Sequence, residues 1–223
     1  MRVPRREIVM PDDIVHIIWR CHNGSHLLFR REIKEKIIDL YFKYCDQYNI
    51  KIIDFQNLDN HVHWVLKAPD AESLGAFTKT VHSQIASYVN TLLKRNSQVI
   101  RDRYKSPPVR DERYCERLIG YVLLNRLKAD KTTRPEHDPC CSAYHRIHNT
   151  KYGKQLANYS DLGLCKPGED LKYLNRLLKH CISKLFDDLG YYDRSNFTNQ
   201  FAVGSQSTIL KIIREISDRK KTL

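Results

Sequence analysis

The chain has 223 residues, with 38 Lys or Arg against 26 Asp or Glu, a formal net charge of +12 and a pI near 9.4. It contains no apolar run approaching the roughly 18 residues that span a bilayer. The basic N-terminal residues 1–7 lack the apolar core of a signal peptide. We therefore expect a cytoplasmic protein with no membrane partner. The basic excess favours binding to phosphate groups, which weakens as salt rises.

The length suits one domain of about 150 residues with an extension, or two small domains. Seven cysteines are an odd number, and without a secretion signal they are expected to be reduced thiols.

Strand-like and helix-like segments alternate through the first half of the chain. Apolar residues 51–55 and 64–66 flank the turn-forming residues 58–60, which indicates two strands joined by a turn. Apolar positions recur at helical spacing over residues 113–125. The fold class that this pattern predicts is α+β. We expect a central antiparallel sheet of residues 14–21, 50–57, 61–67 and 103–110, with helices 31–48, 71–95 and 113–127 packed on it.

Two histidines stand two residues apart in the expected third strand. Side chains at alternate strand positions point to the same face, so His61 and His63 can form a two-imidazole clamp for a divalent metal. A pair of half-buried sheet histidines with no ligand would have the same spacing, and that alternative stays open.

The expected helix 113–127 carries a tyrosine and an asparagine that share one face. Tyr121 and Asn125 lie four residues apart, so both could meet a metal held by the histidines. The chemistry would be phosphoryl transfer with the phenol as nucleophile. A free phenol ionises near pH 10, so the metal or a nearby cation must help. The alternative is that Tyr121 is an ordinary aromatic residue of an amphipathic helix.

Several ordered motifs resemble one known family. They are the strand and loop of residues 15–29, Asn60-His61-Val62-His63, Arg103-Tyr104-Lys105-Ser106, Tyr121-Val122-Leu123-Leu124-Asn125-Arg126 and Ser142-Ala143-Tyr144. Over roughly residues 11–148, the chain resembles the HUH-type single-tyrosine transposases, and most closely the REP-associated tyrosine transposases among them.

The resemblance implies a ferredoxin-like fold and a metal-dependent reaction on single-stranded, hairpin-bearing DNA. By that resemblance His61, His63 and Asn125 would bind Mg²⁺ or Mn²⁺, and Tyr121 would attack the DNA. The products would be a 5′-phosphotyrosyl link and a free 3′-hydroxyl. The site would be assembled in a monomer or across a homodimer, since both arrangements occur in the family.

The sequence departs from the family pattern at two places. Arg126 stands where a proline usually follows the asparagine, and Leu58-Asp59 stands where Met-Pro usually precedes Asn60. Loss of the proline permits the helix to run past Asn125, and Arg126 would add a cation near the scissile phosphate.

A basic segment follows the second long helix and borders the expected site in sequence. We interpret it as a DNA-backbone and base-stacking surface, with a solvated basic strand as the alternative. The DNA-binding residues that we predict are Arg101, Arg103, Tyr104, Lys105, Arg110 and Arg126.

A second metal site is an alternative. His137, Cys140, Cys141, His145 and His148 could bind zinc, although their spacing does not match paired Cys-x-x-Cys motifs. A zinc-stabilised interaction module is therefore one competing function, and a non-catalytic DNA-binding protein that keeps the fold is another.

The C-terminal part of the chain has two amphipathic segments, residues 169–189 and 205–218, each with apolar positions at helical spacing. We expect a catalytic domain over 1–149 and a helical extension over 150–223. The extension would either bind DNA or serve as a packing or dimerisation appendage.

Overall fold

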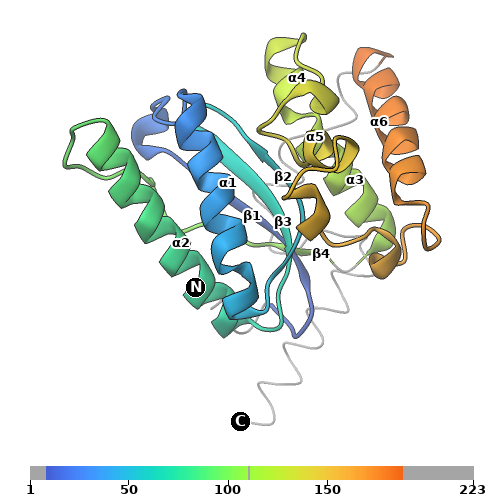
Figure 1. Cartoon of the computed structure of the whole chain (residues 1–223), viewed down its shortest axis with the longest axis horizontal. Coiled ribbons are helices and arrows are strands. Elements are labelled where there is room, and N and C mark those ends of the chain that lie inside the picture. Colours follow the sequence, from blue (N-terminus) through green and yellow to red (C-terminus); the bar gives the residue numbers. More distant parts are fainter. Residues whose placement is uncertain (1–8, 110, 188–223) are drawn as a thin grey trace, which may run out of the picture.

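The structure is a computed structural model that describes residues 9–109 and 111–187. Four strands form one antiparallel sheet in the spatial order β2-β3-β1-β4 (Figure 1). The strands are β1 (Ile14–Arg20), β2 (Lys51–Asn57), β3 (His61–Lys67) and β4 (Pro108–Val109). β1 and β3 pair along their whole length at the centre of the sheet.

Two long helices, α1 (Arg31–Cys45) and α2 (Ala71–Leu92), cover one face of the sheet (Figure 1). α1 continues into a short 3-10 turn, η3 (Asp46–Tyr48). The chain order β1-α1-β2-β3-α2-β4 combined with this strand order is the ferredoxin-like arrangement, so the predicted α+β fold is confirmed.

The core under α1 and α2 is built on alternate strand residues. Trp64 of β3 is fully buried, with its ring stacked 3.7 Å from that of Tyr41 and 4.4 Å from that of Phe55. Its Nε1 donates to Asn57 Oδ1 at 3.0 Å, which satisfies the one polar atom of the indole. Because Trp64 faces this core, His63 must face the other side of the sheet.

The opposite face is covered by α3 (Glu112–Leu123), α4 (Asn125–Asp130), α5 (Ser142–Ile147) and α6 (Asp170–Asp187) (Figure 1). Short 3-10 turns precede α1 and connect the later helices: η2 (His22–Gly24), η4 (Pro135–His137), η5 (Gly153–Gln155) and η6 (Ser160–Leu162). Leu174 and Leu178 of α6 share one apolar core with Val122 of α3 and Val65 of β3. The described part of the expected extension thus packs on the core of the first segment, and the domain division at residue 149 stays a prediction.

A buried polar network ties β2 to α5. The Asp54 carboxylate accepts hydrogen bonds from Ser142 Oγ at 2.7 Å and Tyr159 Oη at 3.1 Å, and Arg146 Nε lies 3.5 Å from it. Arg146 also donates to the carbonyl oxygens of Ile53 and Ala157, so a buried cation faces the buried carboxylate. This network holds the segment after α4 against the sheet.

Three expected boundaries differ from the structure. β4 has two residues instead of the expected 103–110, because Pro107 and Pro108 lack the N–H groups that a strand ladder needs. The expected helix 113–127 is interrupted at Leu124, with φ −87° and ψ 1°, and then runs on as α4 to Asp130. The expected helix 205–218 lies outside the described residues.

Within residues 9–109 and 111–187, no helix has both the length and the apolar character needed to cross a membrane.

Candidate active site

His61 and His63 lie on the face of β3 that is turned toward α3. Their side chains are 7% and 1% exposed, and their ring centroids are 5.0 Å apart at an interplanar angle of 77°. The two imidazoles are therefore adjacent on one face, as the alternation of the strand predicts.

Each of these histidines has its Nδ1 atom in a hydrogen bond. His61 Nδ1 lies 2.6 Å from Asn60 Oδ1, and His63 Nδ1 lies 2.9 Å from Nε2 of His16 on β1. With the amide oxygen of Asn60 on this side, the oxygen accepts and His61 Nδ1 donates. In the contact between His63 and His16 either ring nitrogen can be the donor, because the roles depend on the tautomer. A hydrogen bond at Nδ1 orients each ring, as in metal-binding imidazoles.

Tyr121 reaches this face from the last turn of α3. Its ring is 2% exposed and lies 5.5 Å from that of His63 and 6.3 Å from that of His16. All three residues belong to one chain, so the tyrosine and the histidine strand meet without a second copy. Lys128 Nζ lies 5.2 Å from the Tyr121 ring centroid and is a cation close to the phenol.

Asn125 begins α4, immediately after the irregularity at Leu124. Its side chain is 6% exposed, and among the described residues its Nδ2 atom is buried with no hydrogen-bond partner. The two ends of an asparagine amide are interchangeable in placement. A buried amide end without a partner is what a residue awaiting a ligand would show.

These donors fit a divalent metal ion. Two imidazole nitrogens and one amide oxygen suit an ion that accepts nitrogen and oxygen ligands, such as Mn²⁺, while Mg²⁺ prefers oxygen. In the described part of the chain, no cluster of three His, Cys, Asp or Glu side chains is placed to hold a metal. A third protein donor beside His61 and His63 would therefore be of another residue type, and Asn125 is the one that the sequence predicts.

A family model described as "Transposase IS200 like" matches residues 11–123, which is more than half of the chain. The chain belongs to the IS200-like transposase family. The matched range contains His61, His63 and Tyr121 and stops just before Asn125. The resemblance to single-tyrosine transposases that the motifs indicate is thereby confirmed.

One similar solved structure is titled "Structure of the REP associates tyrosine transposase bound to a REP hairpin". It matches this transposase with a TM-score of 0.56 and 13% sequence identity, covering 71% of this chain and 92% of that chain. At this identity the likeness concerns the fold. No curated protein matches the chain.

Sequence reasoning missed His16 and Lys128. His16 stands in the first strand, and only the pairing of β1 with β3 brings it to His63, which is 47 residues away. Lys128 follows Tyr121 by seven residues, which is two helical turns, and that spacing was a usable signal.

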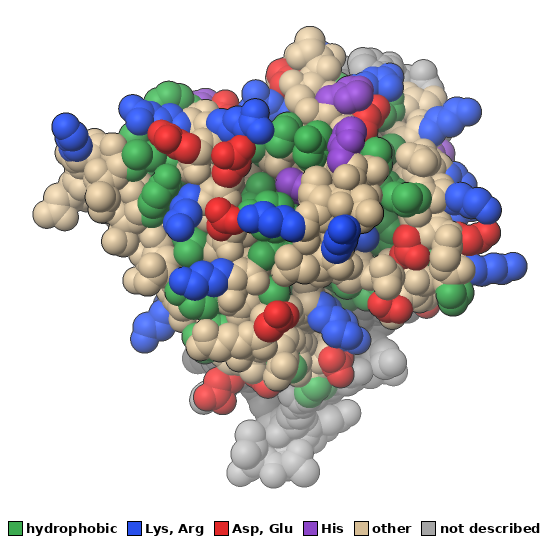
Figure 2. Space-filling model, in the orientation of Figure 1, with side chains coloured by type: hydrophobic (Ala, Val, Ile, Leu, Met, Phe, Trp, Pro, Cys, Tyr) green, Lys and Arg blue, Asp and Glu red, His purple; other side chains and the backbone are tan. Residues whose placement is uncertain are grey.

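The predicted DNA-binding residues of this IS200-like transposase differ in exposure. Arg101, Arg103 and Lys105 are exposed. Lys105 forms a bridge with Ile18, which in turn pairs with His63, so its backbone lies two strands, or about 10 Å, from the histidine strand. On the face shown in Figure 2, Lys and Arg side chains are spread among Asp and Glu and do not gather in one patch.

Of the predicted DNA-binding residues, Tyr104 is buried in the structure. The Tyr104 ring is only 6% exposed and packs edge-on against His82 at 5.7 Å, so it offers no free face for base stacking. Arg110 lies outside the described residues.

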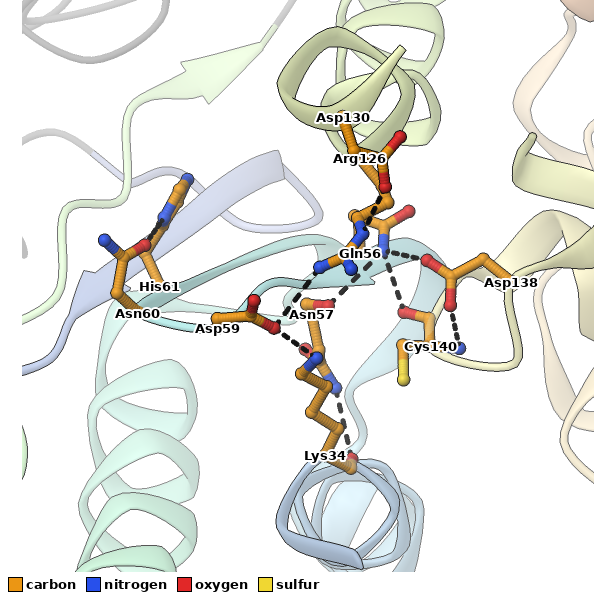
Figure 3. A network of polar contacts seen from close by, with 10 residues as sticks. All are labelled: Lys34, Gln56, Asn57, Asp59, Asn60, His61, Arg126, Asp130, Asp138 and Cys140. Atoms are coloured by element: carbon orange, nitrogen blue, oxygen red, sulfur yellow. Dashed lines mark hydrogen bonds and ion pairs between the residues drawn. The ribbon is translucent and has the colours of Figure 1, made fainter. Parts of the chain in front are cut away.

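Arg126, which we expect to add a cation near the scissile phosphate, forms two ion pairs within the protein. Its guanidinium lies 3.2 Å from Asp59 Oδ1 and 2.8 Å from Asp130 Oδ2 (Figure 3). Although burial opposes ionisation, Lys34 and Arg126 together hold the pKa of the Asp59 carboxyl below its ordinary value. The charge of the Arg126 guanidinium is therefore compensated by the carboxylates of Asp59 and Asp130.

The zinc interpretation of His137, Cys140, Cys141, His145 and His148 is wrong, because these side chains do not converge on one point. Both ring nitrogens of His145 are used, by Thr150 Oγ1 and by the Pro139 carbonyl, each at 2.9 Å. Burial raises the pKa of the Cys140 thiol to about 12 and that of Cys141 well above its ordinary value, which disfavours the thiolate that zinc requires.

Proposed function

We propose that this transposase nicks and rejoins single-stranded, hairpin-bearing DNA in a metal-dependent reaction, with Tyr121 as the covalent nucleophile. The observation that carries the proposal is the position of the Tyr121 ring, 5.5 Å from His63 in the same chain, beside two histidines whose Nδ1 atoms are both hydrogen-bonded. Position and ring orientation together suit phosphoryl transfer.

Tyr121 gives up its phenolic proton and its Oη forms a bond to the phosphorus of the DNA backbone. The bond between phosphorus and the 3′ oxygen breaks, and its electron pair leaves on that oxygen, which takes up a proton. The products are a 5′-phosphotyrosyl link and a free 3′-hydroxyl. The reverse attack by a 3′-hydroxyl on the phosphotyrosine rejoins DNA and restores the phenol.

His61, His63 and Asn125 are the residues that would hold Mg²⁺ or Mn²⁺. A bound ion of this kind polarises a non-bridging phosphate oxygen and offsets the charge that develops on the phosphate. Asn60 and His16 act on the histidines as positioning residues, since each is hydrogen-bonded to the Nδ1 atom of one of them. Lys128, close to the phenol ring, stabilises negative charge as it forms on Tyr121.

Three features support a DNA hairpin as the substrate. The formal net charge is +12, and Arg101, Arg103 and Lys105 are exposed near the sheet edge that leads to the histidine strand. The structural neighbour is described in its title as bound to a REP hairpin. Phosphate contacts of this kind give salt-dependent binding.

The test is a gel assay for a covalent protein–DNA adduct on labelled hairpin oligonucleotides taken from the DNA that flanks the gene. We expect an adduct with Mn²⁺, no adduct with chelator and none with Tyr121→Phe. Tyr114→Phe, on the same helix α3, is the matched control and should keep the adduct. A wild-type protein that binds these hairpins and never forms an adduct would contradict the proposal.

A non-catalytic DNA-binding protein is the second candidate. The observation that favours it is the burial of Tyr121, whose side chain is only 2% exposed in the absence of DNA. This candidate predicts salt-sensitive hairpin binding that is the same in wild type and in Tyr121→Phe, with no adduct under any metal condition.

A further inference from the structure

The candidate metal ligands come from two separate segments, which must keep a fixed position relative to each other if they are to bind one ion. His61 begins β3 and follows the turn after β2, whereas Asn125 begins α4 on the helical layer. Sequence separation between these segments is more than sixty residues. The charged residues Asp59 and Arg126, which adjoin the two ligands in sequence, contact one another across this gap.

Arg126 Nη1 lies 3.2 Å from Asp59 Oδ1, and Figure 3 shows the Asp59 carboxylate between Arg126 on one side and Lys34 of α1 on the other, beside Asn60 and His61. The same Oδ1 atom accepts from Lys34 Nζ at 2.5 Å. One carboxylate therefore links helices that cover opposite faces of the sheet.

The contact is partly shielded from water. The side chains of Arg126 and Asp59 are 29% and 33% exposed, and that of Lys34 is 9% exposed. Within α4, Asp130 Oδ2 accepts from Arg126 Nε at 2.8 Å and fixes the direction of the guanidinium. A planar guanidinium held by two carboxylates keeps one geometry better than a flexible lysine would.

We propose that the Asp59–Arg126 ion pair is a positioning device for the metal site, which fixes Asn125 and the start of α4 relative to His61. This inference rests on the proposed function, because it assigns the ion pair to the site that would hold the metal. The pair acts through the backbone of its neighbours and touches neither metal nor DNA.

The test measures Mn²⁺ affinity by calorimetry in Asp59→Asn, Arg126→Gln and the double variant, at a temperature well below unfolding. Removing residues that hold metal ligands costs about 10- to 100-fold in affinity. We expect a loss of at least about tenfold in each single variant and a loss in the double variant smaller than the product of the two, since the two changes share one contact while each also removes another, with Lys34 or with Asp130. Arg126→Lys should fall between wild type and Arg126→Gln.

Arg134→Gln is the matched control, because it removes a comparable ion pair, with Glu136 at 3.3 Å, from the segment after α4. It should bind Mn²⁺ as wild type does. Hairpin affinity in chelator should be unchanged in Asp59→Asn, which keeps every predicted DNA-binding residue. If the Asp59 and Arg126 variants lose thermal stability but bind Mn²⁺ normally, the pair is merely structural and the inference is overturned. A wild-type protein that binds no Mn²⁺ would instead overturn the proposed function.

Discussion

His16 Nε2 lies 2.9 Å from Nδ1 of His63, and both side chains are almost completely buried. The contact joins the two central strands on the face where Tyr121 lies. Its consequence is that the tautomer of His63 is coupled to that of a histidine from another strand.

We therefore predict that His16→Phe weakens Mn²⁺ binding by about 10- to 100-fold. His16→Gln, whose amide oxygen can accept the Nδ1 hydrogen, should recover part of the loss. Calorimetric titration with Mn²⁺ measures both. His148→Gln, a change at an exposed histidine, serves as the control. Equal affinities for the Phe and Gln variants would show that the hydrogen bond is not what matters.

Lys105 is predicted to contact a DNA phosphate, because it is exposed and its backbone pairs with the strand next to the histidines. Lys105→Gln should weaken hairpin binding and lower the slope of log K against log salt by about 1. Binding titrations between about 50 and 200 mM salt give that slope. Lys172→Gln on α6 should leave it unchanged, and an unchanged slope in Lys105→Gln would remove this residue from the DNA surface.

Arg146→Met should destabilise the protein by about 3–5 kcal/mol, because it leaves the Asp54 carboxylate buried without its cation. Burial already raises the pKa of Asp54 despite the opposing effect of Arg146. Adding Asp54→Asn to Arg146→Met should restore part of the stability, since no buried charge remains. Urea unfolding measures the free energies, and an Arg146→Met variant as stable as wild type would argue against a charged network.

Asp70 caps α2 by accepting from Ser73 N at 2.7 Å, and this backbone hydrogen bond lowers the pKa of the Asp70 carboxyl. Because the pKa of Asp70 is lower in the folded state, the ionised carboxylate stabilises the folded protein at pH values above its ordinary pKa of about 3.9. This stabilisation is lost as pH falls through the pKa that Asp70 has in the folded state. Asp70→Asn keeps a capping oxygen without the charge. Its melting temperature should lie below that of wild type at neutral pH, and the difference should shrink below about pH 3. A difference that is constant with pH would contradict this account.

The parts of the fold and site that follow from local pattern could be predicted from sequence. Alternation in a strand placed His61 and His63 on one face, and apolar spacing predicted the helix that carries Tyr121. What depends on partners distant in sequence could not be predicted. The contact of His16 with His63 requires the strand register, and the contact of Arg126 with Asp59 spans 67 residues.

The errors in the basic segment have the same origin. Tyr104 was expected on a surface, but its ring meets His82 of α2, and nothing in the local sequence shows that a helix lies there. The expected strand 103–110 shortened to β4 because two successive prolines cannot donate to a ladder. That second difference was visible in the sequence as Pro107-Pro108.

Strand β3 separates two apolar cores. Trp64 points into the core under α1 and α2, and His63 points to the opposite face, where Tyr121 lies. Because the two cores are separate, we expect the layer that carries Tyr121 to open by local unfolding while the aromatic stack around Trp64 stays closed. On heating, the proposed DNA nicking should then be lost before the near-ultraviolet circular dichroism of Trp19 and Trp64, which share one core, changes. The proposed activity would then be lost when the helical layer that carries Tyr121 unfolds, although the tryptophan signal would still indicate a folded protein.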